Sequence, residues 1–334
     1  MDLPSKVLFS LCALSFAAQA QPVFVEGVSL DEGWYDSNKK SKWNWQAKPT
    51  GYYYPDVWPD DSAMCWAHAA TNVLQWWQDG QASAYMPPAA PNGASDTAKP
   101  FYAVIPGKVG QQLVNDPLYV QQLAIFKDIA KNWGNTAGTV KQAYNWYFNG
   151  GHVEAFGGTL NNANSGGYYS TLGLVMNPDG VTSSLFTSYT FNDNFTRNEI
   201  ITTLREYIDN SYGTTLRVIG AAGGHAITMW GYEMSNDEFF VYLTDSDDYQ
   251  HALIKQKVIF ADDNYAYLTA CEGDAAVYTD EWTTSINGVQ QTFQGIMLSE
   301  AQAFMAPSLT VPEPTTATLS LLALAALAAR RRRK

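Results

Sequence analysis

The chain has 334 residues, of which 46% are hydrophobic and 14% aromatic, and its 32 acidic and 20 basic side chains give a formal net charge of −12 at pH 7. A hydrophobic fraction of this size favours a packed core and excludes an intrinsically disordered chain. The net negative charge excludes nucleic acid and anionic membrane surfaces as general partners, because an acidic surface is repelled by both.

The N-terminus has the pattern of a secretory signal peptide. Residues 1–20 combine a lysine, an apolar run and the small-x-small ending Ala18-Gln19-Ala20. Removal of this segment during export leaves a mature chain that begins at Gln21. We therefore predict a signal peptide at 1–20, one folded domain at 21–311 and a C-terminal segment at 312–334.

An amphipathic helix is predicted to begin close to Cys65. Asp61 and Ser62 are favourable helix N-caps, and the apolar residues after them recur at helical spacing. These apolar residues are Trp66, Ala69, Ala70, Val73 and Trp77. The pattern places Cys65 in the first turn of the helix.

The rest of the chain changes from helical to strand-like patterns. Helical patterns occur at 111–131 and 138–147, and a capping box formed by Thr196 and Glu199 begins another helix. From Thr215 onward, apolar and β-branched runs alternate with turns. Helices followed by antiparallel strands predict the α+β class.

A β-hairpin is predicted at 225–248, where two strand-like runs flank the polar loop EMSNDE. Symmetrical pairing about Ser235 places His225 opposite Asp245. A carboxylate beside an imidazole fixes the tautomer of the ring and stabilises its cationic form. Asp247 offers a second carboxylate on the same side if the strand continues.

Two cysteines, Cys65 and Cys271, remain after removal of the signal peptide. A disulfide between them is one interpretation, because exported proteins are oxidised. A cysteine in the first turn of a helix also lies near the positive end of the helix dipole, which lowers the thiol pKa, and a protonated histidine lowers it further. Cys65, His225 and Asp245 therefore also fit a nucleophile, its base and an orienting acid.

The acidic run from Asp245 to Asp248 has a second possible role as a calcium site, because it offers oxygen ligands at alternate positions. It lacks the glycine turn and the distal glutamate of an EF-hand loop. We therefore expect no metal and no organic cofactor.

Three groups of residues have the same order and local sequence as a known family. They are GWYD at 33–36 followed by Lys39, then Cys65 with Asn72, Leu74 and Trp76-Trp77 after it, then His225 with Trp230-Gly231 and the run from Thr244 to Asp247. Together they resemble the IdeS/Mac family of secreted, immunoglobulin-degrading cysteine proteases.

The resemblance implies a papain-like fold and a role for each matched residue. Cys65 matches the nucleophile, His225 the base, Asp245 the acid that orients the base and Asp247 a supporting acid. Lys39 matches the lysine that stabilises the oxyanion, a role that needs a donor aimed at developing negative charge.

The C-terminal string VPEPTTATLSLLALAALAARRRRK, residues 311–334, contains a Pro-Glu-Pro turn, an uncharged run and five consecutive cations. The uncharged run is short for a bilayer span, which needs ~20 residues, although an ordinary membrane anchor is one interpretation. The string resembles the PEP-CTERM sorting signal of Gram-negative bacteria, which is recognised and removed during export. This resemblance implies export and sorting machinery as partners, transient membrane contact through the segment, and secretion or display at the cell surface.

Taken together, these features predict an exported cysteine endopeptidase that hydrolyses peptide bonds in a protein substrate. By resemblance the substrates are immunoglobulin-like proteins, and other extracellular proteins are the alternative. Two other functions fit the same residues: a catalytically inactive surface-binding module that uses the aromatic loops at 43–58 and 157–169, and a transglutaminase-like acyltransferase that uses the same three residues.

Overall fold

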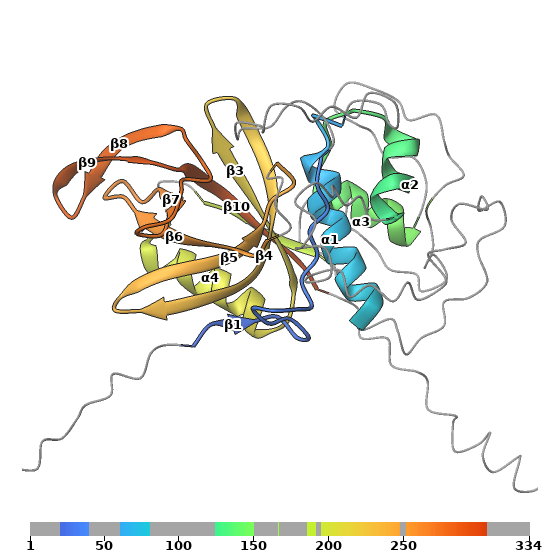
Figure 1. Ribbon diagram of the computed structural model, residues 1–334, viewed down its shortest axis with the longest axis horizontal. Coiled ribbons are helices and arrows are strands. Elements are labelled where there is room, and N and C mark those ends of the chain that lie inside the picture. The colour runs from blue at the N-terminus through green and yellow to red at the C-terminus, as the bar shows by residue number, and fades with distance from the viewer. Residues whose placement is uncertain are drawn as a thin grey trace, which may run out of the picture.

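The computed structural model describes residues 21–39, 61–80, 124–149, 166, 186–191, 195–247 and 252–305. Within these residues the chain is an α+β fold, in which helices lie against a closed antiparallel sheet (Figure 1). The predicted class is therefore confirmed. The predicted signal peptide, the C-terminal segment and both aromatic loops, apart from Gly166, lie outside the described residues.

The sheet closes on itself through six strands, in the order β4, β3, β10, β7, β6 and β5, because β5 also pairs with β4. These strands are β3 (Gly213–Gly220), β4 (Gly223–Ser235), β5 (Glu238–Thr244), β6 (Ile254–Phe260), β7 (Ala266–Ala270) and β10 (Ile296–Phe304). Two short strands extend the sheet: β1 (Val23–Phe24) pairs with β4, and β2 (Phe186–Thr190) pairs with β10. A separate ribbon of β8 (Glu281–Ile286) and β9 (Val289–Gln294) projects from one end (Figure 1).

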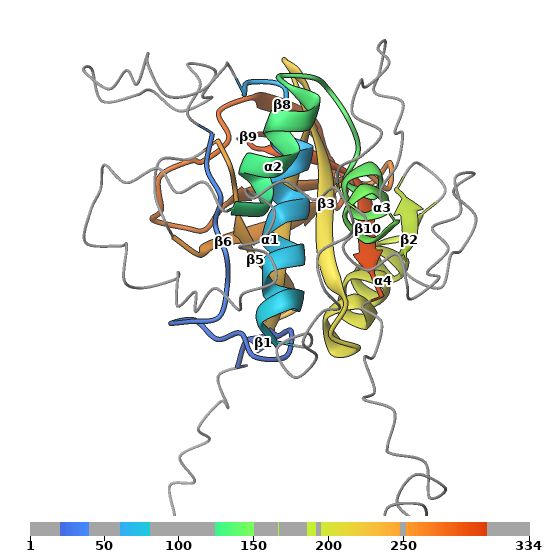
Figure 2. The ribbon, with the colours of Figure 1, turned by 90° about the vertical axis from the view of Figure 1, so that its right-hand side faces the viewer.

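Helix α1 (Cys65–Gly80) lies between the sheet and two other helices (Figures 1 and 2). One side contacts β3 and β4, and the other contacts α2 (Ala124–Trp133) and α3 (Val140–Asn149). Because partners surround it, α1 is buried on every side from Trp66 to Gln78. The part of the predicted helix at 111–131 that precedes Ala124 lies outside the described residues.

Helix α4 (Arg197–Asp209) begins at the predicted capping box and packs against β1, β3, β4 and β10. The Glu199 backbone N–H donates to the Thr196 hydroxyl at 3.3 Å, and the Thr196 backbone N–H donates to the Glu199 carboxylate at 2.7 Å. These two bonds satisfy donors that the first turn of a helix leaves free. The predicted capping box of Thr196 and Glu199 at the start of this helix is therefore confirmed.

The predicted register of the β4–β5 hairpin is wrong. The turn falls on Asn236 and Asp237, whose φ angles are 51° and 65°, and Ser235 pairs with Glu238. Two residues with positive φ form a turn whose twist matches that of paired strands, so this turn is favoured over one centred on Ser235. His225 is consequently not directly opposite Asp245.

A β-bulge between Met229 and Gly231 brings the two residues back to one face. Beyond the bulge the register shifts by one residue, so that Thr228 pairs with Thr244. Continued to His225, the shifted register leads to Asp247, with Asp245 diagonal to it on the same face. Without the bulge the alternation of side chains would place His225 on the opposite face from both acids.

Aromatic side chains of three elements meet in the core. Trp77 of α1 is fully buried, and its ring centroid lies 5.0 Å from that of Phe148 in α3 and 6.1 Å from that of Phe304 in β10. Aromatic rings dominate the burial of apolar area in such a core, and edge-to-face pairs add further stability. Trp77 therefore joins the helices to the sheet.

We expect Trp77→Ala to lower the free energy of unfolding by about 3–5 kcal/mol, because the substitution leaves a large cavity in the core. Urea unfolding of both proteins measures the change. Val289→Ala on β9, where the side chain is 59% exposed, is the matched control and should change the free energy by less than about 0.5 kcal/mol. Equal effects of the two substitutions would contradict this account of the core.

Candidate active site

Cys65 is the first residue of α1 and is partly exposed. The turn before Cys65 is held by Asn135, which lies in the loop between α2 and α3. The Asn135 side chain accepts from the Ala63 backbone N–H at 2.8 Å and donates to the Ser62 hydroxyl at 3.1 Å. Asp61 and Ser62 lie in this turn, so the prediction that they cap the helix is wrong. The last residue before the helix is Met64, whose carbonyl accepts from Ala67 and His68.

His225, at the start of β4, lies between Cys65 and the acids. Its Nε2 is 2.6 Å from Asp245 Oδ1, and the two side chains are only 3% and 2% exposed. The ring also interacts with the Cys65 side chain, and the two residues line the same cavities. Because Asp245 occupies Nε2, the ring nitrogen available to the thiol is Nδ1. The imidazole of His225 therefore lies between the sulfur of Cys65 and the carboxylate of Asp245.

The charges in this group favour a thiolate and an imidazolium. Burial opposes the charged forms of Cys65 and His225, but other groups outweigh it. His225 and Lys39 lower the pKa of the Cys65 thiol, and Asp245 and Asp247 raise the pKa of His225 well above its ordinary value. The Ala226 backbone also contributes to the lowered pKa of Cys65. A lowered thiol pKa beside a histidine and a lysine is typical of reactive cysteines.

Asp245 is held in place by further donors. The Tyr278 hydroxyl donates to Asp245 Oδ2 at 2.9 Å, and the Asp247 backbone N–H donates to Oδ1 at 2.9 Å. Although burial opposes ionisation, His225 and these hydrogen bonds lower the pKa of Asp245 below its usual value. An ionised Asp245 is thus fixed against the imidazole.

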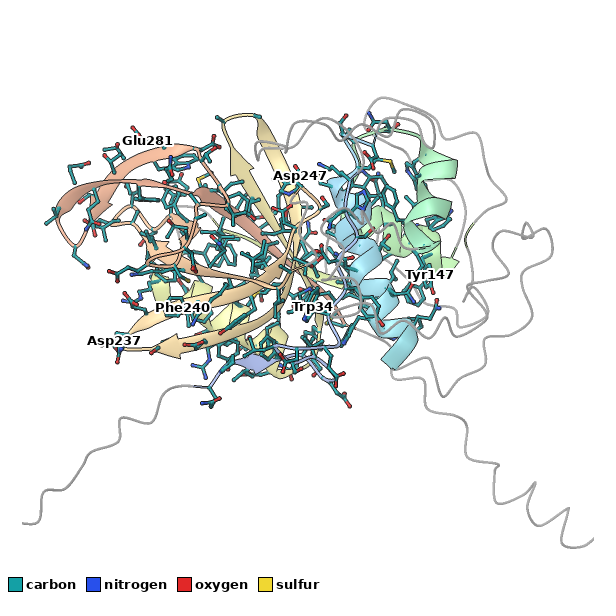
Figure 3. All side chains as sticks on the ribbon, in the orientation of Figure 1. Trp34, Tyr147, Asp237, Phe240, Asp247 and Glu281 are labelled. Carbon is teal, nitrogen blue, oxygen red and sulfur yellow. The ribbon has the colours of Figure 1, made fainter. Side chains whose placement is uncertain are left out.

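Lys39 reaches the site from the loop that precedes α1. Its backbone N–H donates to the Ser246 carbonyl at 2.8 Å, and its Nζ lies 2.5 Å from Asp247 Oδ1. Burial lowers the pKa of Lys39, but the negative charges of Cys65 and Asp247 outweigh burial, so the pKa is raised. The ammonium group is therefore a fixed cation close to the sulfur. Figure 3 shows Asp247 where the sheet meets α1.

A cleft passes over the Cys65–His225 pair. It consists of a cavity of about 320 Å³ lined by Lys39 and Asp247, and a cavity of about 470 Å³ on the other side, lined by Arg217 and Glu300. Cys65, Trp66, Ala137, Gly138, Gly224 and His225 line both. A side chain on residue 138 would place its Cβ 2.6 Å from the Trp66 ring, so glycine is required at this point of the wall.

The five residues predicted for the site, Cys65, His225, Asp245, Asp247 and Lys39, are thus brought together by the fold. Sequence reasoning missed Tyr278, because no motif surrounds it and only the closed sheet brings it to Asp245. It also gave no role to Asn72. The Asn72 side chain accepts from the Ser37 backbone N–H at 2.9 Å and donates to the Thr228 hydroxyl at 3.1 Å, so it links the Lys39 loop to β4.

His68, one turn after Cys65, is a buried structural residue. Its Nδ1 lies 2.8 Å from the Ser37 hydroxyl, and its ring stacks on Phe126 with 3.5 Å between centroids. Burial lowers the pKa of His68 although Asp61, 3.7 Å away, opposes this. A neutral His68 therefore supports the loop that carries Lys39.

Two other interpretations of these residues are a disulfide and a calcium site. Cys65 and Cys271 are both free thiols, so the disulfide interpretation is wrong for this structure. His225, Asp245 and Asp247 are a group of described residues whose ligand atoms are close enough to share a metal ion. Lys39 and His225 already balance the two carboxylates, so the donor set fits an ion-pair network better than a calcium site. Asp248 lies outside the described residues.

Among the described residues, no helix has the length and apolar character needed to cross a membrane. A family model for the PEP-CTERM protein-sorting motif matches residues 310–334. No curated protein matches the chain. The motif marks an exported protein that is sorted to the cell surface, and the exosortase sorting machinery is its partner in that step.

Proposed function

We propose that this surface-sorted protein is a cysteine endopeptidase with a papain-like arrangement of its catalytic groups. One observation carries the proposal: Cys65 and His225 line the same cleft, and His225 Nε2 is 2.6 Å from Asp245 Oδ1. A nucleophile hydrogen-bonded to a base that a third group orients is the arrangement that acyl-transfer enzymes use.

In the proposed reaction the Cys65 thiolate attacks the carbonyl carbon of a peptide bond and forms a tetrahedral intermediate. The oxyanion accepts hydrogen bonds from Lys39 Nζ and from the Cys65 backbone N–H at the start of α1. The His225 imidazolium gives its proton to the departing amine, which leaves an acyl-enzyme. Neutral His225 then takes a proton from water, the resulting hydroxide attacks the thioester, and Cys65 leaves as a thiolate.

The architecture supports this assignment. The nucleophile begins a buried helix, and the base and acid belong to an antiparallel sheet that the helix contacts, so the cleft lies between the two parts. Rigid elements hold reacting groups in position more accurately than loops do. Sorting to the surface supports extracellular proteins as the proposed substrate class, and the IdeS/Mac resemblance puts immunoglobulin-like domains first among the substrates to be screened.

The thiol chemistry is tested by alkylation with iodoacetamide over a range of pH, with each cysteine followed by peptide mass. We expect Cys65 to react at pH values below the ordinary thiol pKa of about 8.5. Its pKa is lowered, so the reactive thiolate persists until the pH falls below that lowered pKa. Cys271 should react only at higher pH, because burial raises its pKa.

Cys271 serves as the internal control, and His225→Ala as the matched variant. Loss of the imidazolium should remove the advantage of Cys65 at low pH and leave Cys271 unchanged. Identical pH profiles for the two thiols in the native protein would contradict the proposed function. Incorporation of an added amine in place of hydrolysis would instead identify an acyltransferase.

A further inference from the structure

The larger cavity of the cleft has a wall that the proposed reaction does not use. This wall lies on the side of Cys65 away from Lys39 and consists of Arg217 on β3 with Glu300 and Gln302 on β10. Among the described residues that line this cavity, Arg217 is the one lysine or arginine. A substrate that extends through the cleft from Cys65 on this side must pass it.

The Arg217 guanidinium lies beside the part of β4 that carries His225. Arg217 pairs with Ala226 of β4, and its Nε and Nη2 atoms lie 3.7 and 3.8 Å from the position that a Cβ on Gly224 would occupy. Gly224 and Ala226 are the two neighbours of His225. The cation is therefore close to the scissile bond that Cys65 would attack.

Arg217 and Glu300 differ in how they are held. They are directly paired across β3 and β10, but Glu300 accepts a hydrogen bond from Gln302 Nε2 at 2.9 Å, and Gln302 Oε1 accepts from the Thr215 hydroxyl at 3.3 Å. The Arg217 side chain is exposed and has no hydrogen bond or ion pair with any residue that the structure describes. The guanidinium of Arg217 is thus available to bind a substrate group, whereas the Glu300 carboxylate is hydrogen-bonded to Gln302 of the same strand.

Resting on the proposed function, we infer that Arg217 forms a subsite for an acidic side chain of the peptide substrate, close to the scissile bond. A guanidinium binds a carboxylate through two parallel hydrogen bonds, and such charge-assisted pairs are stronger than neutral ones. Glu300, on the same wall, limits this attraction and disfavours a second negative charge.

The test uses pairs of peptides that carry glutamate or glutamine at each of about three positions on either side of the cleavage point. For the native protein we expect kcat/KM to be about tenfold higher for glutamate at one position, as a partly exposed charge-assisted contact provides. Arg217→Gln should reduce this ratio to about one. Glu300→Gln, the matched control in the same cavity, should keep or increase it.

Cleavage without any glutamate preference, or a preference that survives in Arg217→Gln, would overturn the subsite and leave the hydrolase proposal standing. If the native protein cleaves none of the peptides and Cys65 shows no low-pH alkylation, the proposed function falls, and the subsite with it. If Arg217→Gln does not fold, Arg217→Glu replaces it as the test variant. This variant should cleave peptides with lysine at the same position faster than peptides with glutamine. An unchanged preference for glutamate would overturn the inference.

Discussion

Replacement of Cys65 by alanine is expected to abolish peptide-bond hydrolysis, with a fall in kcat of about 10⁴-fold or more. Cys65 supplies the sulfur of the proposed nucleophile, and it lines both cavities of the cleft together with His225. Alanine removes the nucleophile and leaves the rest of the cleft in place. The rate of appearance of new N-termini, followed by mass spectrometry on a peptide library, measures the effect.

The matched control is Cys271→Ala, which removes the other free thiol of the described residues. Cys271 donates to the Lys255 carbonyl at 3.6 Å and does not line either cavity of the cleft. We expect this variant to retain full activity. Cleavage that persists in Cys65→Ala at the native rate would show that the hydrolysis has another source.

Replacement of Lys39 by methionine is expected to lower kcat by about 10²–10³-fold with little change in KM, as loss of one oxyanion donor does. Methionine keeps much of the length of the side chain and removes the ammonium. Lys39 is only 5% exposed, and no other lysine or arginine is among the described residues that line the cavity that it shares with Cys65. Steady-state kinetics on one cleaved peptide separates kcat from KM.

The same substitution leaves Asp247 buried without its cation, which we expect to cost about 3–5 kcal/mol of unfolding free energy. Adding Asp247→Asn removes the uncompensated charge, so the double variant should recover part of the stability but none of the lost kcat. Asp247→Asn alone is the control for effects on His225, whose Nδ1 lies 3.9 Å from Asp247 Oδ2. Recovery of kcat in the double variant would make Lys39 a purely structural residue.

Local signals in the sequence were enough to predict several elements. The capping box at Thr196 begins α4, and alternating runs from Thr215 onward form the antiparallel strands. The helix that begins at Cys65 was also predicted, because apolar spacing identifies a helix without reference to its neighbours. The Asp61 and Ser62 caps were misplaced, since a turn held by Asn135 separates them from the helix.

The pairing of His225 with Asp245 depended on details that a strand pattern does not contain. The hairpin turn is displaced from Ser235, and the bulge after Met229 then corrects the alternation of side chains. Strand β4 is buried on both faces from Ile227 to Glu233, so no alternation of polar and apolar residues reveals the extra residue that the bulge inserts. The two residues meet as expected, but through a different register.

By itself, the sequence determined the α+β class, the sorting motif at the C-terminus and the identity of the candidate catalytic residues. Only the tertiary structure decided that Tyr278 holds Asp245, that Lys39 pairs with Asp247 and that Arg217 borders the cleft. Helix starts and strand patterns arise from interactions between residues a few positions apart. Contacts between distant segments arise from closure of the sheet and packing of α1 against it, and these depend on the register of every strand at once.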